Sequence, residues 1–215
     1  MPPYIRGRNT NTKKTLLAAA ALALCLSARA ASAQDQSARR NGGDIDGNVR
    51  IKSMYTTLDA KKCVEVPVPD VPSEDQSGDY GMQQCPGIAG FSLLTLYGDM
   101  RESVTVVAPG GKQYPQQYWE VVSAAFGSVD KRAEWVGTQK RGSKIFEPFA
   151  LIVRYNASEN ASDVNKTTAY LAVSKIDMDR DEICVVAKIR PGANQNEKAR
   201  EAAFNLRNGP CMASN

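Results

Sequence analysis

The chain contains no histidine, and this limits the catalytic chemistry that its 215 residues can perform. Without an imidazole, Ser-His-Asp and Cys-His nucleophiles, histidine metal sites and imidazole acid–base catalysis are excluded. A pair of carboxylates remains, and Glu134 and Glu147 are candidates because both flank apolar stretches. The interpretation that we favour is that both face solvent from a strand. The sequence therefore predicts neither a catalytic residue nor a cofactor.

Three aspartates at alternating positions, Asp177, Asp179 and Asp181, resemble the start of a calcium-binding loop. An EF-hand needs Gly at its sixth position and Glu at its twelfth. Glu182 and Lys188 stand at those positions, so the EF-hand is excluded. We favour a polar hairpin turn, and a weak calcium site at the surface is the alternative. No metal centre is predicted.

Four cysteines, Cys63, Cys85, Cys184 and Cys211, remain if Cys25 is removed with an export signal. An even number is typical of a protein from an oxidising compartment. Of the three possible pairings we predict the local one, Cys63 with Cys85 and Cys184 with Cys211. Each bridge would contribute about 3 kcal/mol by closing a loop in the unfolded chain. Four free thiols or a metal site are the alternatives, and the absence of C-x-x-C spacing disfavours zinc.

Residues 69–79 form an acidic stretch between the first two of these cysteines. Glu74, Asp75 and Asp79 have no basic residue nearby, so they form a local negative patch. A polar loop lies at the surface, and a disulfide at its ends would lower the entropy lost on binding. The predicted binding residues of this loop are Glu74, Asp75, Ser77, Gly78, Asp79 and Tyr80. A surface loop without a binding role is the alternative.

Three aromatic residues, Tyr114, Tyr118 and Trp119, follow the Gly110-Gly111 pair. Exposed aromatic rings on a loop can bind a sugar or a peptide, because they combine apolar area with a polar tip. The cluster is therefore the second predicted binding surface. The alternative is that these rings are partly buried in the core.

Short runs of β-branched and aromatic residues predict the strands that would position these side chains. The strongest run is 149–155, which follows Pro148. The runs 168–176 and 183–189 predict a hairpin across 177–182. Further strands are predicted at 63–68, 91–97, 104–108, 119–126 and 133–136. Short, evenly spaced strands favour an antiparallel sheet or barrel.

One helix is predicted near the C-terminus, between Pro191-Gly192 and Asn208-Gly209. Ala199, Ala202, Ala203 and Leu206 give it an apolar face at helical spacing. We therefore expect an α+β fold with a mainly antiparallel β-sheet or a partly closed barrel, one C-terminal helix and two disulfides.

The first thirty-three residues show the three parts of a secretory signal peptide. A basic start precedes an apolar run at 16–26, which is too short to span a bilayer, and Ala31-Ser32-Ala33 fits the cleavage rule. We expect a signal at 1–33, a disordered lead-in at 34–50 and a single β-rich domain at 51–215. The mature protein would be periplasmic or secreted, without an integral membrane segment. Lipidation at Cys25 and an uncleaved anchor are the alternatives.

The net charge of +4 comes from the signal, whose removal leaves 22 basic and 23 acidic residues. Nucleic-acid binding needs a clustered basic face, and the mature chain has no long basic run. We therefore predict a protein or an envelope glycan as the partner, and no nucleic acid.

A series of short motifs spans residues 55–211. They are Tyr55-Thr-x-Leu58-Asp59, Cys85-Pro86-Gly87, Gly98-Asp99-x-Arg101, Glu134-Trp135, Phe149-Ala150-x-x-Val153-Arg154-Tyr155 and the closing helix with Cys211. In this order the motifs resemble a family of uncharacterised exported bacterial proteins. The resemblance implies an exported location and no activity. Members often carry His after the third cysteine, and here that position is Val185.

The short segment Ser77-Gly78-Asp79-Tyr80 is similar to the loop with which periplasmic lysozyme inhibitors enter the lysozyme cleft. The expected function is that of a non-enzymatic periplasmic or secreted binding domain with an unknown partner. A lysozyme-type enzyme inhibitor is one alternative, which the acidic loop favours because lysozymes are basic. A histidine-free hydrolase that uses two carboxylates is the other.

Overall fold

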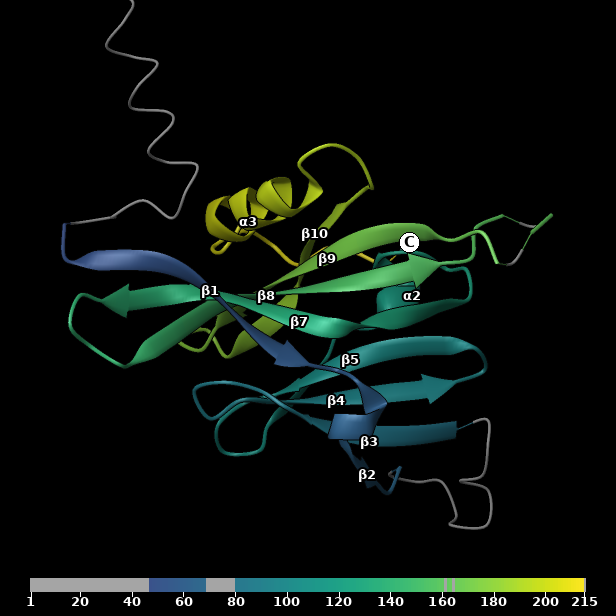
Figure 1. The fold of residues 1–215 in the computed structure, drawn as a ribbon, viewed down its shortest axis with the longest axis horizontal. Helices are drawn as coiled ribbons and strands as arrows, with labels where there is room; N and C mark the ends of the chain where they lie inside the picture. The colour runs from purple at the N-terminus through teal and green to yellow at the C-terminus, as the bar shows by residue number, and fades with distance from the viewer. Residues whose placement is uncertain (1–46, 69–79, 161, 164, 215) are drawn as a thin grey trace, which may run out of the picture. The chain divides into compact units, whose positions relative to one another are not determined.

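Ten strands in one mixed sheet, a C-terminal helix and two disulfides make up the described part of the protein (Figure 1). The computed structural model describes residues 47–68, 80–160, 162–163 and 165–214. The strands are β1 (Val49–Thr57), β2 (Val64–Val66), β3 (Tyr80–Pro86), β4 (Ser92–Gly98), β5 (Arg101–Val107), β6 (Gln113–Pro115), β7 (Gly127–Lys140), β8 (Phe146–Ala157), β9 (Thr168–Asp177) and β10 (Glu182–Ile189). The helices are η1 (Ala60–Lys62), α2 (Tyr118–Val121) and α3 (Gln195–Asn205). The predicted α+β class is confirmed, and because the sheet does not close, the barrel alternative is wrong.

The sheet forks at β7. Its order is β10-β9-β8-β7-β5-β4-β3-β2, and its neighbours are antiparallel except β5 and β7, which pair in parallel at Arg101 and Gly127. β8 occupies one edge of β7. On the other edge β5 meets the first residue of β7, whereas β1 pairs with β7 from Arg132 to Lys140. β1 therefore has one edge bonded to β7 and a second edge on which the described residues place no strand.

The predicted hairpin and the strongest predicted strand are confirmed. β9 pairs with β10 from Asp177 and Glu182 onwards, and the run 149–155 lies within β8. The strand predicted at 119–126 is wrong, because this segment begins with the short helix α2. The buried residues here are Tyr118, Val121 and Val122. They stand at positions i, i+3 and i+4, which lie on one face of a helix but on both faces of a strand.

Two hydrophobic clusters lie on opposite faces of the sheet. The larger contains Trp135 of β7 with residues of β4, β5, β8 and α2, and the smaller packs α3 against β8, β9 and β10. Ala199 and Ala203 of α3 are buried, as predicted, because their small side chains let the helix lie close to the sheet. Leu206 follows the helix and is partly exposed, so the predicted apolar face is wrong at that residue.

The predicted disulfide pairing is confirmed. Cys63 after η1 is bonded to Cys85 of β3, and Cys184 of β10 is bonded to Cys211 in the C-terminal segment. None of the helices in the described residues has the length and apolar character needed to cross a membrane. β1 begins at Val49, two residues before the predicted start of the domain. The predicted signal and most of the lead-in lie outside the described residues.

Candidate functional site

The acidic loop that the sequence singled out lies almost entirely outside the described residues, because Glu74, Asp75, Ser77, Gly78 and Asp79 belong to 69–79. Tyr80 is described. It begins β3 and is exposed, and its ring covers Gly98 on β4, where a Cβ atom would lie 2.6 Å from the ring. The contact role of this loop stays a prediction.

The aromatic cluster is mostly core. Tyr118 is fully buried against Tyr155, with ring centroids 5.6 Å apart, and Tyr114 is buried with its hydroxyl donating to Asp181. An exposed binding surface is therefore wrong for Tyr114 and Tyr118, because burial of their large rings stabilises the fold. Trp119 is half-buried, and its binding role stays a prediction.

The two candidate carboxylates have different surroundings. Glu134 forms an ion pair with Arg200 of α3, with 2.5 Å between Oε1 and Nε, and accepts a hydrogen bond from Ser53 of β1. Glu147 is exposed on β8. Glu134 therefore links β1, β7 and α3, which is a structural role.

The aspartates of the β9–β10 turn are held by cations of the protein itself. Asp177 pairs with Arg180, and Asp181 pairs with Lys112. Asp177 also accepts the backbone N–H of Arg180 across the turn. These contacts are those of the polar hairpin turn that the sequence favoured.

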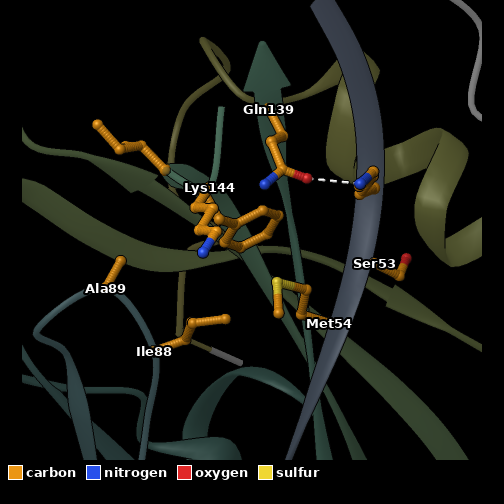
Figure 2. A pocket seen from close by; sticks show the side chains of 9 residues that line it. Ser53, Met54, Ile88, Ala89, Gln139 and Lys144 are labelled. Carbon is orange, nitrogen blue, oxygen red and sulfur yellow. Dashed lines mark hydrogen bonds between the residues drawn. The ribbon is translucent and has the colours of Figure 1, made fainter. Parts of the chain in front are cut away.

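A groove of about 530 Å³ lies between β1, the β3–β4 turn and the β7–β8 turn (Figure 2). Its lining residues are Lys52, Ser53, Met54, Ile88, Ala89, Gln139, Lys144, Ile145 and Phe146. Met54 of β1 and Ile88 point toward each other across it, and Ile145 is 69% exposed. Sequence analysis missed this groove because its residues come from four separate segments. The exposed Ile145 in a turn was the one local signal.

The floor of the groove depends on Gly137. A Cβ atom at this position would lie 2.6 Å from the Phe146 ring and 2.4 Å from the carbonyl oxygen of Glu147. Because Gly137 has no side chain, the buried Phe146 ring can lie across β7 and form the apolar floor of the groove.

The second edge of β1, on the side away from β7, presents backbone groups to its surroundings. Asn48 accepts the N–H of Arg141, and Leu58 donates to Lys131, so the even-numbered residues of β1 face β7. In an antiparallel pair the intervening residues point their N–H and C=O groups away from the partner. These outward residues include Val49, Ile51 and Ser53, and none of the described residues bonds to their outward backbone groups.

Basic residues surround this end of β1. Lys52 and Lys144 line the groove, and Lys140 pairs in register with Val49. Lys52 donates to the neutral amide oxygen of Gln139, at 2.5 Å. Neither Lys52 nor Lys144 forms an ion pair within the described ranges. The groove therefore combines an apolar floor with positive charge at its rim.

A second depression, of about 390 Å³, lies at the end of the larger core where β4, β5, β7 and β8 meet. The exposed Phe126 carries the guanidinium of Arg101 over its ring, 4.8 Å from the centroid. Glu102 and Asn156 also line it. Burial raises the pKa of Glu102, and the hydrogen bond from the Val129 N–H partly offsets this increase.

Glu102 should make stability depend on pH. Its folded-state pKa lies above the ordinary value of 4.5, so the unfolded chain loses the proton first and the free energy of unfolding falls as pH rises above that value. Glu102→Gln removes the charge but keeps an oxygen to accept the Val129 N–H. We expect the melting temperature of the variant, relative to that of the wild type, to increase as pH rises from acidic to neutral. Thermal unfolding of both proteins across this range checks this, and a difference independent of pH would contradict it.

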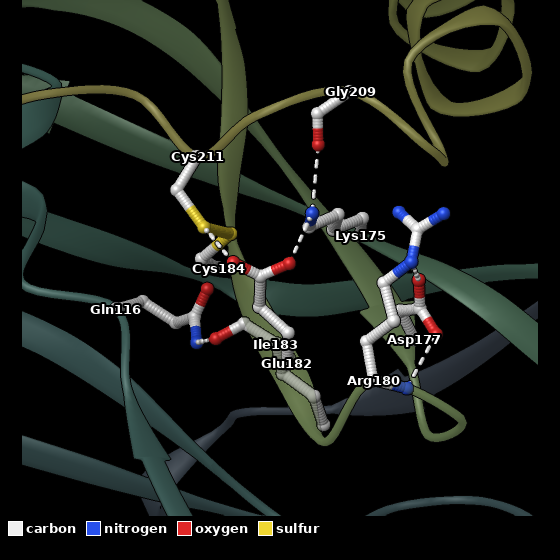
Figure 3. Close-up of polar contacts among 9 residues, drawn as sticks. All are labelled: Gln116, Lys175, Asp177, Arg180, Glu182, Ile183, Cys184, Gly209 and Cys211. Carbon is white, nitrogen blue, oxygen red and sulfur yellow. Dashed lines mark hydrogen bonds and ion pairs between the residues drawn. A yellow bond between two sulfur atoms is a disulfide. The ribbon is translucent and has the colours of Figure 1, made fainter.

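A third polar cluster is built around a buried lysine (Figure 3). The Lys175 ammonium lies 2.5 Å from Glu182 and donates to the Gly209 carbonyl at 2.7 Å. The other oxygen of Glu182 lies 3.0 Å from the Cys211 sulfur, which has no hydrogen to donate because it is bonded to Cys184. Glu182, Cys184 and Cys211 are close enough to hold a metal, but the disulfide and the ammonium already occupy their ligand atoms. This cluster fixes the C-terminal segment to the sheet.

Comparison with known protein families, with curated proteins and with solved structures yields no match. The resemblance to exported bacterial proteins therefore stays a prediction, and function has to be argued from the geometry of the chain itself.

Proposed function

We propose that this protein is a non-enzymatic binding domain that holds a segment of another protein in the groove beside β1. The observation that carries the proposal is the combination of an apolar floor and a basic rim in one groove. Such a groove can recognise a protein segment, because the apolar floor accepts side chains and the charges at the rim select the partner. We also propose that the domain is exported. Two disulfides and the signal-like N-terminal sequence support that location.

A matched pair of variants tests the groove. A library of random displayed peptides is selected on the oxidised protein, and the affinities of the enriched peptides are measured. Ile145→Asp places a charge in the groove, whereas Met178→Asp changes an exposed apolar residue in the β9–β10 turn. We expect Ile145→Asp to weaken binding at least about tenfold, which is about 1.4 kcal/mol, and Met178→Asp to have no effect. Equal affinities for both variants would contradict the proposal, and so would a selection that enriches no binding peptide.

An envelope glycan is the second candidate ligand, at the depression that contains Phe126. An exposed aromatic ring beside the polar side chains of Glu102 and Asn156 suits a saccharide, which has both apolar faces and hydroxyl groups. Titration with the N-acetylglucosamine tetramer, repeated with Phe126→Ala, checks this candidate. The lysozyme-inhibitor alternative depends on residues 69–79, and an assay of lysozyme activity is its test.

A further inference from the structure

We infer that the groove takes the C-terminal end of a partner protein, with its last, apolar side chain on the floor and its terminal carboxylate at Lys52 and Lys144. This inference rests on the proposed function, and it names the part of the partner that binds and the chemistry that selects it.

The positive charge and the apolar floor lie on the same face of the sheet. Lys52 and Met54 are two residues apart on β1, so both side chains point to one face. Phe146 lies on that face as well, because Lys52 pairs with Gly137 and the Phe146 ring covers Gly137. Ile88 faces Met54 across the groove (Figure 2). One ligand in the groove can therefore contact the charge and the apolar surface together.

Both lysines can still donate to an anion. Lys52 donates one hydrogen bond, to the neutral amide of Gln139, and that amide donates in turn to the Ser143 carbonyl. Lys144 is exposed in the turn between β7 and β8. Neither lysine has a carboxylate partner within the described residues. Since an ammonium group has three donors, a ligand carboxylate can accept from both.

The groove suits an anion better than the depression at Phe126 does. There, the guanidinium of Arg101 is already paired with Asp99, and the carboxylate of Glu102 lines the surface. None of the described residues that line the groove is acidic. Of the two sites, the groove is therefore the one whose charge selects a negative ligand.

A chain end meets both requirements with a single residue. In an extended segment, neighbouring side chains point to opposite sides, so an acidic residue next to an apolar one would direct one of the two away from the groove. The last residue of a protein has its carboxylate on the main chain, on the same Cα atom that carries its side chain. Both groups can then enter the groove together, and capture of a terminal carboxylate is a recurring mode of peptide recognition.

Free-acid and amidated peptides test the carboxylate. The probe is an acetylated pentapeptide of glycine and serine that ends in leucine with a free carboxylate, and its counterpart ends in a leucine amide. We expect the free acid to bind the oxidised protein at least about tenfold more tightly than the amide. Its affinity should fall as salt is raised, because screening reduces the attraction to the lysines. Equal affinities for the two peptides would overturn the inference.

A third peptide tests the chain end against an internal acid. It is amidated and has glutamate two positions before the leucine, so both side chains can point to the same side of an extended segment. We expect it to bind more weakly than the free acid. Binding as tight as that of the free acid would show that the groove takes an internal segment, which overturns the inference.

Three lysine variants test where the carboxylate binds. Lys52→Gln and Lys144→Gln each remove one cation from the groove, and both residues are exposed. Lys140→Gln is the matched control, because Lys140 is an exposed lysine next to the same turn but does not line the groove. We expect each of the first two to weaken the free acid about threefold, within the range of exposed ion pairs, and to leave the amide unchanged. An equal loss for the acid and the amide, or for the control, would contradict the assignment.

The outcomes separate this inference from the proposed function. If the selected peptides lose affinity in Ile145→Asp but the acid and the amide bind equally, the groove stays a binding site and the chain end is overturned. If no probe binds and Ile145→Asp changes nothing, the proposed function fails as well. Decanoate, which also joins an apolar chain to a carboxylate, is the last comparison. Tighter binding of decanoate than of the free-acid peptide would assign the groove to a small amphiphile and overturn the inference.

Discussion

Glu182→Ala is expected to lower the free energy of unfolding by about 3 kcal/mol, at the low end of what breaking a buried ion pair costs. The Lys175 side chain is 2% exposed, and Glu182 supplies its only carboxylate within the described ranges. Without Glu182 the ammonium keeps the Gly209 carbonyl as its partner. The low end is appropriate because the Glu182 side chain is 41% exposed, so water can enter beside the lysine.

Two control variants separate the unpaired charge from the lost contacts. Lys175→Met keeps a long apolar side chain in the same space and leaves Glu182 able to reach solvent. We therefore expect it to cost less than Glu182→Ala, and the double variant Lys175→Met/Glu182→Ala to be more stable than Glu182→Ala alone. Denaturant unfolding of the oxidised proteins measures all three. A double variant that loses the sum of the two single losses would show that the two residues do not interact.

Removal of the Cys184–Cys211 disulfide is expected to lower the free energy of unfolding by about 3.5 kcal/mol through the unfolded state. The bridge closes a loop with a sequence separation of 27. It also holds the segment that supplies the Gly209 carbonyl to Lys175 and the Met212 N–H to β10. We therefore expect the free energy of unfolding of Cys184→Ala/Cys211→Ala to fall by more than the loop effect alone.

The Cys63–Cys85 bridge is the matched control, because its sequence separation of 22 gives nearly the same loop effect. Cys63→Ala/Cys85→Ala should therefore lose about as much stability through the unfolded state but leave the C-terminal segment in place. Hydrogen exchange at Met212 distinguishes the two variants, since only loss of Cys184–Cys211 should speed it. Unchanged unfolding midpoints after reduction of the wild type would contradict both expectations.

Local patterns in the sequence explain why some elements were predicted correctly. The strand at 149–155 and the β9–β10 hairpin follow from branched residues and turn residues that are adjacent in the chain. The C-terminal helix ends at Asn205, before the predicted stop at Asn208-Gly209, and both disulfides join cysteines that are neighbours in sequence order. In each case the residues whose interaction determines the structure lie within about thirty residues of each other in the sequence.

Long-range pairing decided the features that the sequence did not predict. The groove needs β1 to lie beside β7 and the β3–β4 turn to face it, and neither contact has a local signal. Lys175 is another example. Ser174 and Lys175 are adjacent on β9, and both are buried because the larger core covers one face of this strand and α3 covers the other.

The outer edge of β1, on which the described residues place no strand, also affects how the protein behaves at high concentration. A free strand edge pairs with any extended chain of suitable shape, and this is how ordered aggregates begin. Lys52 counteracts this tendency, because two copies that approach through the same edge bring like charges together. Solubility during storage should therefore depend on that charge, and either high salt or acetylation of Lys52 would weaken the protection.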